Sequence, residues 1–532
     1  MSGPIVTVAK RIGSVLGYVA MYVLIWAGVF MLITGIGIRM LWGPISVDQM
    51  LMNLVATDTD GGGGSLVVTG VLAFGVLPLV ITLGIAFFHY RRVRSPRARA
   101  GRTAHADDET AGDAGRVRTL GPRWLTRTVS AVMVTAVVVV GSTAFSSSVH
   151  VGEYIKAVNS EYTIDQYYTA PQVESAQDKR NLVMIYLESG EETLSDTDLF
   201  EKDPYIPLKD ATSQDDGWQS IDDFKQYEGG GWTMSGLAST QCGVPLKGNG
   251  IVTGKSGLNS LGGDVGDYLG GLTCSGDILA DEGYKNVFMG GASGSFAAKD
   301  QFLAGHGYDE LYDLDYWRAQ GEPADQFRDD WGLSDNRLMA NAKDKVDELH
   351  EESEQSGQPF NLSMLTVDTH EPVHIYDYCD VDTEAELTSA YQCSMEQVAG
   401  FVDHMEAQGY LDDTAVVIMG DHLKHMGSNN AFGDELDDHP NRTIFNRVWV
   451  PGDDESTSTM RAGVDQVSMM PTILEAAGVR LEGRQAGLGV SAFSSRIPEG
   501  SAQSLDPDVY QELLGSRSAE FYSEAWEGEV LQ

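Results

Sequence analysis

Long hydrophobic runs are missing from most of this 532-residue chain. Three apolar stretches precede residue 150, at about 13–42, 66–88 and 129–147, and none follows them. Each is close to the ~20 residues needed to cross ~30 Å of hydrocarbon. The first lacks an Ala-x-Ala-type cleavage site and is longer than a signal-peptide core, so we interpret it as a retained anchor. The sequence therefore predicts a membrane domain at 1–150 with three transmembrane helices.

Basic residues are scarce, with 36 Lys and Arg against 77 Asp and Glu. Of these, 13 basic and 7 acidic residues precede residue 151, so the remainder carries a net charge near −47. We expect most of this excess to be a solvated surface that keeps the domain soluble. A domain this acidic excludes nucleic acid as a partner, and a phosphate-containing substrate would need a metal and a few local cations to bind.

Lys and Arg are also absent around Gly61–Gly64, between the first two apolar stretches. In contrast, Lys10 and Arg11 precede the first stretch, and ten arginines lie at 91–127, between the second and third. Cytoplasmic loops are enriched in Lys and Arg, so we expect a multi-pass plasma-membrane protein with a cytoplasmic N-terminus and linker 91–127. Everything after residue 150 is then extracytoplasmic. The alternative, an arginine-rich nucleic-acid patch, fits this topology less well.

Cysteine is rare, and all 4 residues lie in the part expected outside the cytoplasm. An even count in an oxidising compartment favours disulfides. Cys242–Cys274 and Cys379–Cys393 form the simplest of three connectivities, and buried free thiols are the alternative.

Beyond a polar and aromatic connector at 151–179, the pattern indicates an α/β domain at 180–532. Short apolar runs at 182–187, 286–289, 362–367 and 415–419 are typical of strands buried on both faces, and amphipathic stretches at 336–352, 394–408 and 467–477 indicate helices. No repeat of solenoid length is present. The alternation predicts a mainly parallel sheet between helix layers.

Polar residues follow three of these apolar runs, where ligands bind in such sheets. They are Glu188 after the first, Asp368, Thr369 and His370 after the third, and Asp421 and His422 after the fourth. Glu188, Asp421, His422 and the hydroxyl of Thr233 together suit one divalent metal with an open position for a phosphoryl oxygen. Such a metal would activate Thr233 as a nucleophile, and the glycines at 229–231 would let the backbone approach a ligand.

The segments 181–189, 231–246 and 366–370 carry a family resemblance. They are similar to phosphoglycerol transferase I, which belongs with lipoteichoic acid synthases in the sulfatase/alkaline phosphatase superfamily, and the likeness covers roughly 180–495. It implies a metal on Glu188, Thr233, Asp421 and His422, with Mn²⁺ favoured over Mg²⁺ or Zn²⁺. It also implies a phosphoryl-threonine intermediate on Thr233, and His370 near the substrate phosphate or leaving group.

Departures from the relatives bear on the substrate. Lipoteichoic acid synthases carry His, Trp and Arg in the segment that here spans 290–302. In this chain Gly290 and Ala297 replace the His and the Trp, and Lys299 is the cation that remains in the segment. We expect Lys299, Trp232 and Asp368 to contact substrate, whereas His374, His425 and Lys424 are weaker candidates. Residues 242–246 lack the C/S-x-P-x-R pattern of true sulfatases, which disfavours sulfate ester hydrolysis.

The resemblance implies a membrane-embedded glycerophosphotransferase that uses phosphatidylglycerol as donor and a cell-envelope glycan as acceptor. Glycerophosphate polymerisation or phosphoethanolamine transfer would use the same metal and threonine with a different head-group pocket. A non-enzymatic alternative is an inactive sulfatase-like binding domain.

Overall fold

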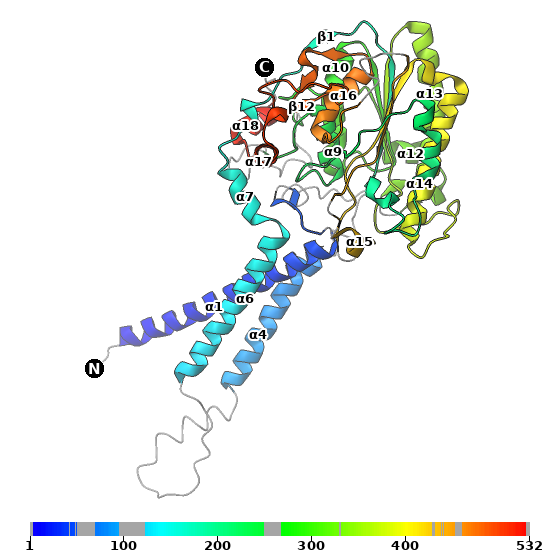
Figure 1. The fold of residues 1–532 in the computed structure, drawn as a ribbon. Helices are drawn as coiled ribbons and strands as arrows, with labels where there is room; N and C mark the ends of the chain where they lie inside the picture. The colour runs from blue at the N-terminus through cyan, green and yellow to red at the C-terminus, as the bar shows by residue number, and fades with distance from the viewer. Residues whose placement is uncertain are drawn as a thin grey trace, which may run out of the picture. The chain divides into compact units, whose positions relative to one another are not determined.

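The computed structural model describes residues 4–41, 43–47, 49–50, 70–94, 123–248, 268–328, 331–427, 431–437, 439, 441–452 and 460–527 (Figure 1). The chain divides into two compact units, Met1–Met40 with Ser65–Val149 and Leu41–Gly64 with His150–Gln532. Most of the predicted linker 91–127 and the predicted Gly61–Gly64 loop lie outside the described residues.

The first unit contains three candidate membrane helices among its described residues, as the hydropathy predicts. The apolar spans are Val15–Leu41 in α1 (Pro4–Leu41), Val71–Arg91 in η1 (Val71–Val76) and α4 (Leu77–Arg94), and Thr128–Ser148 in α6 (Arg123–Ser148). Small residues let α1 and α6 approach closely, because a Cβ on Gly141 would lie 2.1 Å from Gly28 O. Ser148 Oγ also donates to Gly35 O at 2.9 Å.

The second unit is built on a six-stranded sheet in the order β4-β3-β7-β2-β8-β9. Five strands are parallel, and β9 pairs antiparallel with β8 at one edge. Their bounds are β2 Asn181–Leu187, β3 Lys285–Gly290, β4 Glu310–Tyr312, β7 Phe360–Leu365, β8 Thr414–Gly420 and β9 Asn446–Trp449. Each of the four predicted strands is therefore present.

Alternate residues of the central strands enter two different cores, which explains why apolar side chains lie on both faces of β2. In β2, Leu182, Met184 and Tyr186 pack with α9 (Thr233–Cys242), α10 (Ser275–Asp281) and α16 (Met469–Ala476). Val183, Ile185 and Leu187 instead pack with α8 (Ile206–Ala211), α13 (Asp335–Ser356) and α14 (Glu386–Gln408). The sheet thus lies between two helix layers, as predicted (Figure 1).

The three predicted helices correspond to α13, α14 and α16. Pro471, an irregularity in the sequence pattern, lies in the first turn of α16, where its missing N–H is not needed. The predicted connector 151–179 contains α7 (Val151–Val158) and β1 (Val173–Ser175), which pairs with β10 (Arg480–Leu481). The other helices and strands are α11 Lys299–Gly305, α12 Leu314–Gln320, β5 Phe327–Arg328, β6 Gly332–Leu333, α15 Gly433–Asp437, β11 Gln485–Ala486, β12 Gly489–Val490, α17 Pro507–Gly515 and α18 Ala519–Glu527.

Candidate metal centre

The carboxyl ends of β2 and β8 bring three of the predicted ligands together. Leu187 of β2 pairs with Gly420 of β8, so Glu188 and Asp421 follow the two strands at the same level of the sheet. Potential ligand atoms of Glu188, Asp421 and His422 all lie within 4.8 Å of one another, and all three residues are buried. Residues 233 positions apart in the sequence thereby form one cluster.

The hydrogen-bonding pattern of this cluster fits a bound cation. His422 Nδ1 donates to Leu423 O at 2.7 Å, which leaves Nε2 of the neutral ring as an acceptor. That Nε2 lies 3.6 Å from both Glu188 Oε1 and Asp421 Oδ2. Asp421 Oδ2 is buried and accepts no hydrogen bond from the described residues. Acceptors that face one another in a buried site are what a divalent ion stabilises.

Burial and charge favour the protonated forms of Asp421 and His422, whereas the burial of Glu188 is outweighed by the charges of His370 and His422 and the hydrogen bonds from Ser189 and Thr233, so its pKa is lowered. Burial raises the pKa of Asp421 to about 7. Burial also opposes charge on His422, but the carboxylates of Asp421 and Glu188 outweigh it and raise the pKa of the imidazole. Without a cation, Asp421 and His422 would therefore bind protons more readily than ordinary Asp and His residues do.

Thr233 joins the cluster from the first turn of α9. Its Oγ1 donates to Glu188 Oε2 at 3.3 Å. Trp232, the N-cap residue, is extended and only 7 % exposed, so it packs in the core. Ser235, the nearby alternative hydroxyl, is fully buried and bonds Tyr227 OH and Gly229 O. Thr233 is therefore the hydroxyl of this turn that lies against the carboxylate cluster.

His370 comes from the loop after β7, and β7 is the strand that lies between β2 and β3 in the sheet. Its Nδ1 donates to Glu371 O at 2.6 Å, which leaves Nε2 as the acceptor. The ring of Trp331 lies over it, with 3.8 Å between ring centroids. Burial lowers the pKa of His370, while the negative charge of Glu188 opposes this shift, so the two residues are close enough to interact.

A buried arginine fixes the loop that carries His370. Arg328 donates to four carbonyl oxygens of this loop, those of Val367, Asp368, His370 and Pro372. Neither Arg328 nor Trp331 belongs to the motifs that sequence reasoning used. Both lie at the β5–β6 hairpin, and only the tertiary path of that hairpin brings them to His370.

The predicted substrate-contacting residues differ in their surroundings. Lys299 is 4 % exposed, and burial lowers the pKa of its ammonium group. The negative charges of Asp313, Glu188 and Asp421 act in the opposite direction but do not cancel this shift. Its ammonium group is thus within electrostatic range of the cluster. Asp368 is instead tied to the start of α13, because its Oδ2 accepts from Asp335 N at 3.0 Å and from Tyr378 OH. These contacts account for Asp368 structurally, and its contact with substrate stays a prediction.

Two weaker sequence candidates lie beside the ligands. The ring of His425 lies 5.0 Å from that of His422, and Lys424 Nζ forms an ion pair with Glu371 Oε2 at 2.6 Å. Two glutamines hold the backbone of the loop 421–423, which carries Asp421 and His422. Gln226 Oε1 accepts from Leu423 N and Gln466 Nε2 donates to Asp421 O, each at 2.8 Å. No motif in the sequence pointed to either glutamine. Their role depends on contacts between distant loops.

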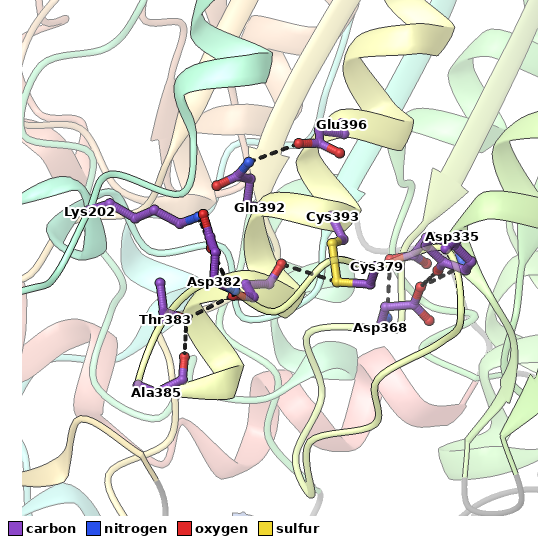
Figure 2. Close-up of a disulfide and its surroundings, with 12 residues drawn as sticks. Lys202, Asp335, Asp368, Cys379, Asp382, Thr383, Ala385, Gln392, Cys393 and Glu396 are labelled. Atoms are coloured by element: carbon purple, nitrogen blue, oxygen red, sulfur yellow. Dashed lines mark hydrogen bonds and ion pairs between the residues drawn. A yellow bond between two sulfur atoms is a disulfide. The ribbon is translucent and has the colours of Figure 1, made fainter.

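Both disulfides have the pairing that the sequence favours. Cys242–Cys274 joins the end of α9 to the start of α10. Figure 2 shows Cys379–Cys393, which joins the loop after β7 to α14 close to Asp335 and Asp368. Cys242 and Cys274 also lie near His306, but the disulfide leaves no thiolate there, and both nitrogens of His306 have partners in Asp277 and Tyr268 O.

Comparisons with known proteins agree with the motif resemblance. Residues 224–479 match the family described as Sulfatase. Phosphoglycerol transferase I of Escherichia coli is 30% identical over 344 residues, which is 62% of this chain and 41% of that protein. The Xanthomonas campestris enzyme of the same name is 34% identical over 268 residues, 49% of this chain and 36% of that protein. The chain thus spans about two fifths of the length of these relatives.

The comparison with solved structures gave matches with TM-scores below 0.5. An alkaline phosphatase superfamily protein from Vibrio parahaemolyticus has a TM-score of 0.48 at 17% identity, covering 71% of this chain and 94% of that one. The lipoteichoic acid synthase LtaP from Listeria monocytogenes has a TM-score of 0.48 at 16% identity, covering 68% and 97%. The sequence matches confirm the expected resemblance: residues 224–479 match the sulfatase family, and part of the chain is similar to phosphoglycerol transferase I.

Proposed function

We propose that this protein is a membrane-anchored glycerophosphotransferase that transfers a glycerol phosphate group from phosphatidylglycerol to a cell-envelope glycan through Thr233. The observation that carries the proposal is the position of the Thr233 hydroxyl, 3.3 Å from Glu188 in a cluster suited to a metal. A threonine at this place, with two carboxylates and an imidazole behind it, suits phosphoryl transfer through a covalent intermediate.

The first step breaks the bond between phosphorus and the diacylglycerol oxygen as Thr233 Oγ1 bonds to phosphorus. The leaving oxygen takes up the proton that Thr233 gives up. A divalent metal held by Glu188, Thr233, Asp421 and His422, with Mn²⁺ favoured over Mg²⁺ or Zn²⁺, would stabilise the threonine alkoxide and the charge on the phosphoryl oxygens. Lys299 adds positive charge on the substrate side.

In the second step, a glycan hydroxyl replaces Thr233 on phosphorus and transfers its proton to Thr233. His370 is suited to move protons in both steps, because Nδ1 is held by Glu371 O and Nε2 remains for substrate. Burial lowers the pKa of His370, which favours the neutral ring with an unprotonated Nε2.

The proposed location is the outer side of the plasma membrane. The three candidate spans agree with membrane anchoring, and the arginines at 91–127 favour a cytoplasmic linker. Two disulfides in the second unit support an oxidising compartment for that unit. Phosphatidylglycerol of the outer leaflet would then be available as donor.

The test uses the purified full-length protein with phosphatidylglycerol labelled in its terminal glycerol, Mn²⁺ and a cell-envelope glycan extract. We expect label on the Thr233 peptide, then on glycan, with release of diacylglycerol. Phosphatidylethanolamine labelled in its head group is the matched control. Transfer of label from phosphatidylethanolamine alone would favour a phosphoethanolamine transferase. Long glycerophosphate products would favour a polymerase. A protein that binds no metal and is inactive would favour a binding domain.

A further inference from the structure

A short segment after the first candidate span belongs to the same unit as the metal cluster. This post-span segment, Gly43–Met50, is described at 43–47 and 49–50 and starts two residues after Leu41, where the span ends. It is packed into the unit, since Ile45 is 7 % and Gln49 is 6 % exposed. A glutamine this buried needs polar partners within the protein.

The start of the post-span segment lies against the loop that follows the metal ligands. Gly43 has a φ of +78°, and a Cβ there would lie 2.6 Å from Met426 O. Only glycine combines this backbone conformation with so close an approach. Met426 is the residue after His425, whose ring lies 5.0 Å from that of His422. The contact therefore adjoins the metal-binding loop.

The end of the post-span segment reaches the loop that carries the nucleophile. Gln49 Nε2 donates to Gly231 O at 3.5 Å, and Ser46 Oγ accepts from Gln49 N at 3.0 Å. Ser46 Oγ also lies 3.9 Å from where a Cβ of Gly229 would be. Gly231 is separated from Thr233 by Trp232 alone, so a shift of its carbonyl moves the first turn of α9.

We propose that the post-span segment is part of the catalytic site, and that Gln49 is a positioning residue that holds the Gly229–Gly231 loop so that Thr233 stays beside Glu188. This role rests on the proposed function of Thr233. Gln226 and Gln466 hold the Asp421–Leu423 backbone, while Gln49 holds the nucleophile loop from a part of the chain that precedes the sulfatase-family match. Phosphoryl transfer depends on such placement, because the attacking oxygen must be held in line with the leaving oxygen.

The test compares full-length wild type with Gln49→Ala and with Gln49→Glu, which keeps the size of the side chain but removes its donor. Gln408→Ala, at the exposed end of α14, is the matched control. Hydrogen exchange of the 227–235 peptide, metal content and turnover of bis(p-nitrophenyl) phosphate with Mn²⁺ are measured for each.

Both Gln49 variants should exchange faster in the 227–235 peptide and lose about 10- to 100-fold in kcat with little change in KM or metal content, the range for a displaced catalytic group. Gln408→Ala should match wild type. Wild-type exchange in both Gln49 variants, or faster exchange throughout the second unit, would overturn the positioning role. If wild type acts neither on this phosphodiester nor on labelled phosphatidylglycerol, the proposed function fails, and the exchange measurement still decides this inference.

Discussion

Gly236 of α9 lies directly against the main chain of Asp421. A Cβ at position 236 would fall 2.1 Å from Asp421 O, so only a residue without a side chain allows this approach. Gly236 is three residues after Thr233, and Asp421 begins the loop that holds two of the proposed metal ligands. Backbone contact thus positions α9, which carries the proposed nucleophile, against the loop that carries two of the proposed metal ligands.

Gly236→Ala should therefore disturb the site more than a helical Gly→Ala change normally would. Placing a methyl group against a fixed carbonyl oxygen should destabilise the second unit by about 1–3 kcal/mol and lower activity through displacement of Thr233. Gly400→Ala in α14 is the control, because its Cβ would meet only Lys343 Nζ at 3.5 Å. Thermal unfolding and turnover compare the two variants; equal behaviour would contradict the close contact.

The identity of the nucleophile is tested by a matched pair of substitutions. Thr233→Ala removes the hydroxyl that donates to Glu188 and should abolish both the covalent intermediate and turnover. Thr233→Ser keeps a hydroxyl and should retain measurable activity. Mass spectrometry of the protein trapped with phosphatidylglycerol locates the adduct, and its appearance on Ser235 would refute the assignment.

Metal binding should depend on charge at Asp421 more than on its shape. Asp421→Asn preserves the hydrogen bonds from Ser189 N and His422 N to Oδ1 but removes the negative charge. Wild type at 100 times its metal Kd should gain about 2.7 kcal/mol of stability, and the variant should gain almost none. Thermal unfolding with and without Mn²⁺, together with elemental analysis, measures this difference. Asp412→Asn, on the exposed surface, should behave as wild type.

Much of the fold and cluster could be predicted because their signals are local. After their first residues, Asn181 and Thr414, β2 and β8 have no polar residue, and Glu188 and Asp421 are the first polar residues after them. Edge strands β4 and β9 were missed because they are short and mix polar with apolar residues. Trp331, Gln49 and Gln466 could not be found, since their contacts depend on how distant loops fold together.

Asp368 shows the limit of position along a strand as a guide to function. It follows β7 much as Glu188 follows β2, yet its hydrogen bonds are to Asp335 N at the start of α13 and to Tyr378. Sequence position predicts the edge of the sheet that a residue reaches. It does not distinguish a carboxylate that caps a helix from one that faces a substrate.

Lys299 should contribute to donor recognition without contributing to metal binding. Lys299→Met keeps much of the apolar stem and removes the charge. The transition-state stabilisation calculated from kcat/KM for phosphatidylglycerol should therefore fall by about 1.5–3 kcal/mol, the range for a charge-assisted hydrogen bond. Metal content should stay at the wild-type level. Lys299→Arg, which keeps the charge, should recover part of the loss. Unchanged donor kinetics in Lys299→Met would remove this residue from the substrate site.

A second buried carboxyl group, outside the metal cluster, should make stability depend on pH. Asp465 is 6 % exposed and accepts a hydrogen bond from Tyr510 OH at 2.8 Å. Burial raises its pKa from 3.8 to about 6. Below pH 4 the group is protonated in both the folded and the unfolded chain, so it costs nothing there. Between pH 4 and 6 the unfolded chain releases its proton first, and folding becomes less favourable as the pH rises.

Asp465→Asn should remove this pH dependence while keeping an oxygen for the Tyr510 hydroxyl. The free energy of unfolding of wild type relative to the variant should fall by about 2.4 kcal/mol as the pH rises from 4 to 7, which is most of the value of a shift of about two pKa units. Other titrating groups are common to both proteins and cancel in the difference. Thermal unfolding of both full-length proteins across this pH range measures it, and a difference that is constant with pH would show that Asp465 has an ordinary pKa.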